Sequence, residues 1–152
     1  MNDNIVRIHP LVVAEAGGLV DETGVCLALY GDALDPKEIT ALLGNSATHS
    51  HRKGDLNRSG RPFATGAWLF EVRGNAPESP EELTCRLLDQ LPSDPKLWSQ
   101  LSESHGVQLR YGLHMDEWNR GFDLSAQTVA RISLLRASIG FDIYAHGPNG
   151  DV

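Results

Sequence analysis

Apolar runs of strand length alternate with helix-period patterns along the chain. A short, mostly apolar run between turn residues predicts a strand, whereas apolar residues three or four positions apart after a capping residue predict a helix. These patterns follow one another in the order strand, helix, strand, two helices, strand, helix, strand. They cover residues 25–30, 35–43, 66–73, 79–91, 97–101, 107–115, 125–139 and 141–145.

This order predicts fold class α+β, with a single mixed, largely antiparallel sheet and helices packed on one face. A ferredoxin-like arrangement is one form that such a sheet could take. A chain of 152 residues fits one domain and can bury a core without a disulfide or a metal. We therefore expect a lead-in over residues 1–24, a single α+β domain over 25–146 and a flexible tail over 147–152.

The composition narrows the classes of partner. A formal net charge of -7 argues against general binding to nucleic acid or to anionic membranes, which are bound through clustered Lys and Arg. The charge is compatible with a basic protein partner, although it also serves solubility. We recognise neither a signal peptide nor a membrane-spanning apolar run, so we expect a cytoplasmic protein. Cys26 and Cys85 have no metal-ligand spacing, and we expect reduced thiols.

Several local signatures occur in a fixed order along the chain. They are Leu-Asp-Pro-Lys-Glu-Ile-Thr at 34–40, Leu-Gly at 43–44, Lys-Gly-Asp at 53–55, Gly-Arg at 60–61, Gly-Ala-Trp at 66–68 and Asp-Ile-Tyr at 142–144. Together they resemble the bacterial domain-of-unknown-function 4279 family over residues 25–145. Such sequences usually carry a Leu-Gly-apolar-x-Pro-Thr turn after the first helix, whereas residues 43–48 here lack the proline. The resemblance implies a small α+β domain and no assigned activity.

The polar segment over residues 45–65 is the first candidate site, because long loops in compact domains are often functional. Lys53, Asp55 and Arg61 bring two cations and a carboxylate together, and Trp68 could add a stacking face. An arginine fork suits a carboxylate or a phosphate, so this group could bind a small anion. The alternative is that Asp55 pairs internally with Lys53 or Arg61 and holds the loop to the sheet.

Histidines suggest a metal site in the same segment. His49 and His51 are two positions apart, so on an extended segment they share a face, and imidazole suits zinc or nickel. Asp55, His114 or His146 could supply further ligands. Solvated loop histidines are the alternative, since no HExxH or CxxC motif accompanies them. We expect no cofactor.

A second polar cluster follows the strand that ends near residue 115. Asp116 and Glu117 lie beside His114, which could then take part in acid–base chemistry, but no nucleophile accompanies them. Trp118 in a polar loop either packs back on the sheet or anchors a contact. Phosphate-binding glycine loops and serine-nucleophile motifs are absent from the sequence.

Two hypotheses about function follow. The first is a non-enzymatic module that binds a basic protein through an acidic surface, as immunity proteins bind toxic nucleases, with Asp116, Glu117 and Trp118 at the contact. The second is a domain that binds a small anionic ligand or a metal through the 49–68 segment. An enzyme would be a special case of the second hypothesis. The sequence leaves the oligomeric state open.

Overall fold

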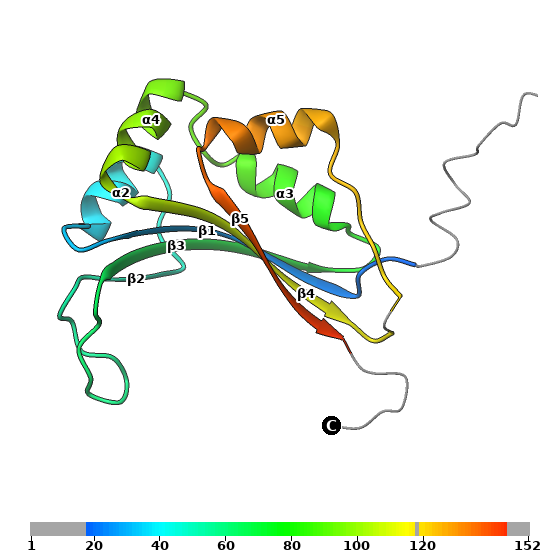
Figure 1. The fold of residues 1–152 in the computed structure, drawn as a ribbon, viewed down its shortest axis with the longest axis horizontal. Helices are drawn as coiled ribbons and strands as arrows, with labels where there is room; N and C mark the ends of the chain where they lie inside the picture. Colours follow the sequence, from blue (N-terminus) through cyan, green and yellow to red (C-terminus); the bar gives the residue numbers. More distant parts are fainter. Residues whose placement is uncertain (1–17, 118, 146–152) are drawn as a thin grey trace, which may run out of the picture.

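The computed structural model describes residues 18–117 and 119–145, and these form one five-stranded sheet with helices on one side (Figure 1). The strands are β1 (Glu22–Gly31), β2 (His49–His51), β3 (Gly66–Asn75), β4 (Gly106–Met115) and β5 (Ser138–Ala145). The helices are α2 (Pro36–Leu43), α3 (Pro80–Leu88), α4 (Pro95–Ser104) and α5 (Ala126–Leu134). The described parts of the chain hold no helix that is long and apolar enough to cross a membrane.

The strand order in the sheet is β2-β3-β1-β4-β5. The central strand β1 runs antiparallel to both of its neighbours, β3 and β4, along almost its whole length. β2 runs antiparallel to β3 at one edge, and β5 runs parallel to β4 at the other. The sheet is therefore mixed and largely antiparallel, as the sequence predicts.

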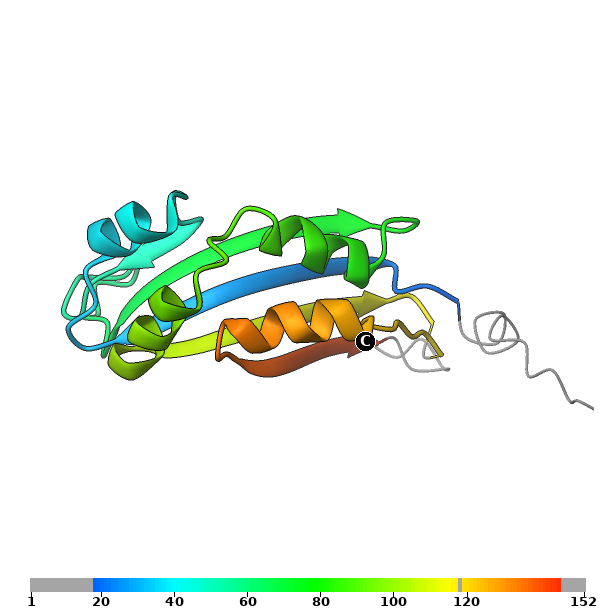
Figure 2. The ribbon, with the colours of Figure 1, turned by 90° about the horizontal axis from the view of Figure 1, so that it is seen from above.

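Each described helix begins at a capping residue. Asp35, Ser79, Asp94 and Ser125 each accept a hydrogen bond from a backbone N–H of the first helical turn, which otherwise has no partner. Pro follows the cap in α2, α3 and α4, where its missing N–H costs nothing. All four helices lie over the same face of the sheet (Figure 2).

The core lies between that face and the helices. Val25, Leu27 and Leu29 occupy alternate positions of β1 and are fully buried, because successive side chains of a strand point to opposite faces. Trp68 and Trp98 are also fully buried and are among the largest side chains of the core. The opposite face of the sheet has no covering layer among the described residues (Figure 1).

The predicted elements occur in the predicted order, with β2 as an additional strand between α2 and β3. The fold class is confirmed, and the ferredoxin-like description stays a prediction. Two local predictions are wrong. The segment over residues 45–65 is not an irregular loop, because it contains β2 and a hydrogen-bonded hairpin. The last helix ends at Leu134 rather than near Gly140, since Arg136 adopts a left-handed conformation with φ 52°, and β5 begins at Ser138.

The predicted division into lead-in, domain and tail concerns several residues outside the described ranges. β1 begins at Glu22, and Val20 of the predicted lead-in is buried in the core. Residues 1–17 of the lead-in and the predicted tail fall outside the residues that the structure describes.

Truncating a central core residue should test this packing. We expect Leu27→Ala to lower the free energy of unfolding by about 2–5 kcal/mol, because it removes buried methyl groups and leaves a cavity. Leu42→Ala, at a position that is 50% exposed, should change the free energy by less than about 1 kcal/mol. Urea denaturation of both variants measures the difference. Equal effects would contradict the assignment of Leu27 to the core.

Candidate functional site

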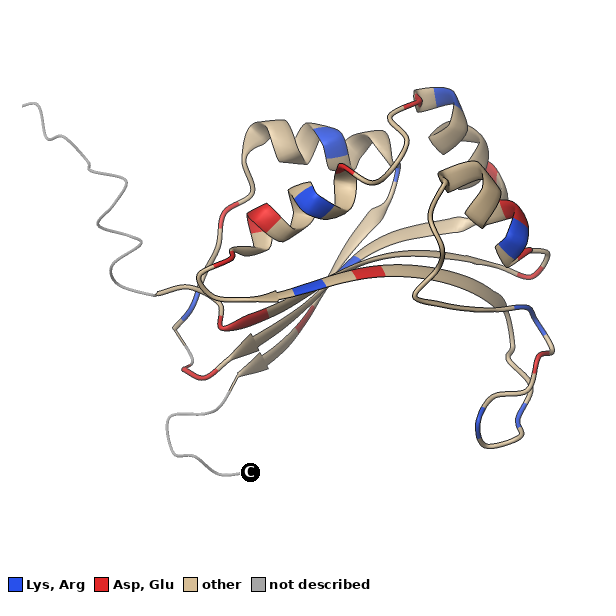
Figure 3. Cartoon of the chain, turned by 180° about the vertical axis from the view of Figure 1, so that it is seen from behind, with Lys and Arg blue, Asp and Glu red and all other residues tan. Residues whose placement is uncertain are grey.

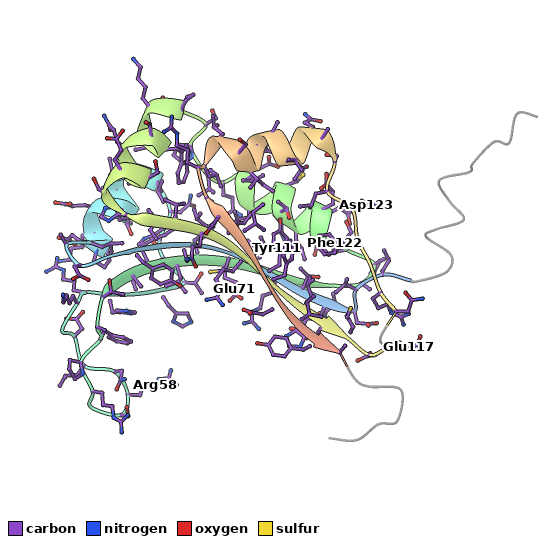
Figure 4. All side chains as sticks on the ribbon, viewed as in Figure 1. Arg58, Glu71, Tyr111, Glu117, Phe122 and Asp123 are labelled. Atoms are coloured by element: carbon purple, nitrogen blue, oxygen red, sulfur yellow. The ribbon has the colours of Figure 1, made fainter. Side chains whose placement is uncertain are left out.

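The candidate site is the face of the sheet that carries no helices, which we call the open face. Figure 4 shows the Glu71 side chain on this face, and Tyr111 and Phe122 on the side of the helices. The open face contains a shallow cavity of about 310 Å³, which we call the hollow. The hollow is lined by Gly24, Cys26, Tyr30, Leu69, Glu71, Arg73, Arg110, Gly112, His114, Asp142 and Tyr144.

A pair of glycines forms the floor of the hollow. Gly24 of β1 lies directly opposite Gly112 of β4 in the antiparallel register, so two neighbouring strands lack a side chain at the same level. A Cβ atom on Gly112 would meet no atom within 4 Å. A Cβ atom on Gly24 would lie 2.9 Å from the Glu71 carboxylate. The hollow therefore exists because this register places two glycines side by side.

Two ion pairs frame the glycine floor. The Arg73 Nε atom lies 3.1 Å from a Glu71 carboxylate oxygen on β3. On the other side, Arg110 of β4 lies 2.9 Å from the Asp142 carboxylate of β5. A hydrogen bond to Glu71 raises the pKa of Arg73. A hydrogen bond to Tyr30 and the charge of Asp142 raise the pKa of Arg110. Because exposed ion pairs add little stability, both arginines can exchange these partners for a bound ligand.

Aromatic side chains border the hollow. The His114 ring stacks on Tyr144, with ring centroids 4.7 Å apart and an interplanar angle of 9°. Tyr30, at the end of β1, is half-buried, whereas Tyr144 is exposed. Tyr and Arg, together with Trp, are enriched at the energetic centres of protein interfaces. The hollow thus combines a recessed floor with the side chains that partner proteins commonly contact.

Cys26 lines the hollow, and its environment suppresses thiolate formation. Burial, followed by the charge of Glu71, raises the pKa of Cys26 to about 11. The thiol therefore stays protonated at neutral pH and is a poor nucleophile. Within residues 18–117 and 119–145, no three His, Cys, Asp or Glu side chains form a group that could hold a metal ion. The arrangement can bind a ligand through hydrogen bonds, ion pairs and stacking.

The comparison with protein families gives one match. A family model described as Domain of unknown function (DUF4279) matches residues 21–146, most of the chain. This chain belongs to the DUF4279 family. Neither the curated proteins nor the solved structures contain a significant match to it.

The loop residues that the sequence selects in this DUF4279 chain do not form one site. Lys53 forms an ion pair with Asp32, outside the predicted group. The Asp55 carboxylate accepts a hydrogen bond from the backbone N–H of Arg52 at 2.7 Å and so closes the base of the hairpin. Trp68 is fully buried and donates its indole N–H to Thr40, so it offers no stacking face to the loop.

The hairpin itself projects from the sheet. The backbone N–H of Gly54 donates to the Phe63 carbonyl at 2.9 Å, and that of Phe63 donates to the Asp55 carbonyl at 2.9 Å. Gly54 and Gly60 have φ angles of 87° and 76°, which other residues rarely adopt. Figure 4 shows Arg58 at the far end of this hairpin, away from the sheet.

The two histidines of the predicted metal site lie on the edge strand β2 of the DUF4279 domain. His49 is exposed, and the His51 ring stacks on Phe63 with centroids 3.5 Å apart. This contact accounts for the position of His51 without a metal. Metal binding by His49 and His51 stays a prediction.

The acidic residues that follow β4, Asp116 and Glu117, form contacts with neighbouring segments of the chain. The Asp116 backbone N–H donates to the Asp21 carboxylate at 2.8 Å, and Glu117 lies 3.2 Å from Arg120. Trp118 lies outside the described residues. In Figure 3, acidic positions lie at this end of the sheet, and the projecting hairpin at the opposite end carries several basic ones.

Sequence reasoning missed most of the hollow. Of the charged and aromatic residues that line the hollow, the sequence predicts a site role only for His114. It does so with the 49–51 histidines or with Asp116 and Glu117, and not with the other residues of the hollow. A signal was present, since the alternating pattern of β4 leaves Arg110, Gly112 and His114 on the polar face of a predicted strand. Grouping them with Glu71 and Asp142 required the strand order and register, which a single sequence does not supply.

The thiol of Cys26 gives a direct test of the electrostatics. In a Cys85→Ser variant of this DUF4279 chain, the rate of alkylation by iodoacetamide should rise about tenfold per pH unit from neutral pH to about pH 10, because only the thiolate reacts. When the same variant is unfolded in urea, its alkylation rate should stop rising with pH near the ordinary pKa of cysteine. A plateau in the folded protein below about pH 9 would contradict a pKa raised to about 11.

Proposed function

We propose that this DUF4279 domain is a non-enzymatic binding module that recognises a partner protein through its open face. The observation that carries this proposal is the glycine-floored hollow, framed by the Arg73–Glu71 and Arg110–Asp142 ion pairs. A side chain of the partner fits in the hollow, while the surrounding tyrosines and arginines contact its backbone and neighbouring residues. Protein interfaces commonly centre on such a recess lined by Tyr and Arg.

The chemistry of the hollow supports binding over catalysis. A reaction needs a nucleophile or an acid–base pair with a pKa matched to its task. Cys26 is held as a thiol. His114 is stacked on Tyr144, and Arg110 is bound to Asp142. These contacts favour a recognition surface in which each polar group has a partner until a ligand replaces it.

The charge of the chain supports a basic partner. With a formal net charge of -7, the domain attracts proteins of positive charge and accelerates their encounter. At one end of the sheet lie four acidic residues, Asp21, Glu22, Asp116 and Glu117. Glu22 of β1 lies directly opposite His114 of β4, which lines the hollow, so this acidic end adjoins the hollow. An immunity-like role, in which a cytoplasmic bacterial protein caps a basic toxic enzyme, agrees with this charge and size.

Filling the hollow tests the proposal. Gly112→Phe places an aromatic ring where a Cβ atom has open space in the hollow, and Ala130→Phe adds the same ring at an exposed position of α5, on the opposite side of the sheet. Tagged wild-type protein and both variants are used to capture partners from a host lysate at low salt. We expect the wild type and Ala130→Phe to retain the same basic protein and Gly112→Phe to lose it.

Thermal unfolding of each variant serves as the folding control, and Phe in place of Gly suits a strand. Retention of the partner by a folded Gly112→Phe variant would contradict recognition through the hollow. Capture of no protein by the wild type would contradict the partner-binding role itself.

The exposed end of the hairpin favours a second candidate function, the binding of a small anion. No ion pair of Arg58 or Arg61 is found among the described residues, although Arg52 and Lys53 are paired with Asp35 and Asp32. Unpaired arginines on a protruding hairpin suit phosphate or carboxylate groups. This is the alternative that the sequence indicates for Lys53, Asp55 and Arg61.

A thermal-shift assay distinguishes this candidate. If the hairpin binds anions, inorganic phosphate should raise the unfolding midpoint of the wild type but not of an Arg58→Ala/Arg61→Ala variant, because a ligand of the native state stabilises it. Zinc added in the same assay tests His49 and His51. If no addition moves the midpoint, and Lys53→Ala with Arg61→Ala only lowers it, the hairpin is structural.

A further inference from the structure

The two edges of the sheet differ in how far they are protected from pairing with another strand. β2 forms one edge over only three residues, and the part of β3 that extends beyond β2 carries Glu71 and Arg73, charged residues that discourage strand addition. β5 forms the other edge and has eight residues. In the described part of the chain no strand pairs with the outer side of β5, so its backbone N–H and C=O groups there face outwards. Such an edge is a template for strand addition.

The side chains of β5 do not discourage that addition. Ile139, Phe141 and Ile143 alternate along the strand and are 45%, 50% and 60% exposed. They lie on the side of the helices, because Phe141 stacks on the core residue Tyr111 with centroids 5.2 Å apart. β5 has no Lys, Arg or Pro, the residues with which proteins usually block exposed edges.

The charge on β5 is already neutralised within the chain. Asp142 is the one charged residue of the strand, and it forms an ion pair with Arg110 at 2.9 Å. A second β5 strand can therefore approach without meeting an uncompensated charge. The exposed apolar row is also the same on both strands, as an interface with two-fold symmetry requires.

We propose that two copies of this chain associate by pairing their β5 strands antiparallel about a two-fold axis. The axis passes through Phe141, so that Phe141 faces its counterpart and Ile139 faces Ile143 of the second copy. This register covers all three apolar residues on each strand. It also places Asp142 opposite Gly140, whereas an axis through Asp142 would bring two carboxylates together, which costs stability.

The proposed pair joins two five-stranded sheets into one continuous sheet with the helices of both copies on the same side. The two open faces then adjoin each other, and each hollow stays uncovered. Pairing at β5 is independent of the proposed partner binding, because neither requires the other to occur.

Light scattering coupled to size exclusion tests the pairing with the full chain. We expect the wild type to have twice the mass of one chain and Ile143→Lys to have the mass of a single chain, because an inward lysine on an edge strand blocks pairing. Leu42→Lys is the matched control, since Leu42 is a similarly exposed apolar residue on α2 at the other end of the sheet, and it should remain a dimer. A monomeric wild type, or a dimeric Ile143→Lys, would overturn the proposal.

Engineered cysteines test the register. Residues directly opposite in an antiparallel pair have Cα atoms about 4.5–5.5 Å apart, which suits a disulfide. Phe141→Cys should therefore cross-link two copies under mild oxidation, whereas Ile143→Cys should not, because the two Ile143 positions lie four residues out of register. Wild-type protein under the same oxidation shows whether the native Cys26 and Cys85 cross-link two copies by themselves. Cross-linking at Ile143 in place of Phe141 would overturn the proposed axis.

Discussion

The structure depends on the register of β1 between β3 and β4. Residues of β1 are paired with both neighbours along nearly the whole strand, and side chains alternate between the two faces. Val25, Leu27 and Leu29 thereby reach the core, whereas Gly24, Cys26 and Tyr30 reach the hollow. A slip of one residue would exchange these two sets, so burial of the apolar set also fixes the composition of the open face.

The same register explains why the hollow is polar and yet orderly. Gly24 and Gly112 leave space, and the charged side chains beside them are paired, Arg73 with Glu71 within β3 and Arg110 with Asp142 across β4 and β5. Burial beside Glu71 keeps the Cys26 thiol protonated, which removes the most reactive group from the chemistry of the site. What remains is a set of exchangeable ion pairs and aromatic edges, and such a set suits recognition of another molecule.

Local signals in the sequence were sufficient for the elements but not for the site. Capping residues such as Asp35 and Ser79 mark helix starts, and the alternation over residues 107–115 marks β4, so order and fold class could be predicted. The hairpin was missed because its turns depend on Gly54 and Gly60 in left-handed conformations, within a segment that lacks periodicity. The hollow was missed because it joins four strands whose order depends on tertiary packing. Trp68 was considered for a ligand site, but a tryptophan in an apolar strand serves the core here.

We propose that a partner binds in the hollow on the open face. Amide resonances of glycines report on it directly, because Gly24 and Gly112 form the floor while Gly54 and Gly60 lie in the hairpin. The measurement is a two-dimensional ¹H–¹⁵N NMR titration of the labelled chain with the captured partner. We expect the resonances of Gly24 and Gly112 to shift or broaden most, and those of Gly54 and Gly60 to stay unchanged. Perturbation confined to Gly54 and Gly60 would contradict binding in the hollow and would assign recognition to the hairpin.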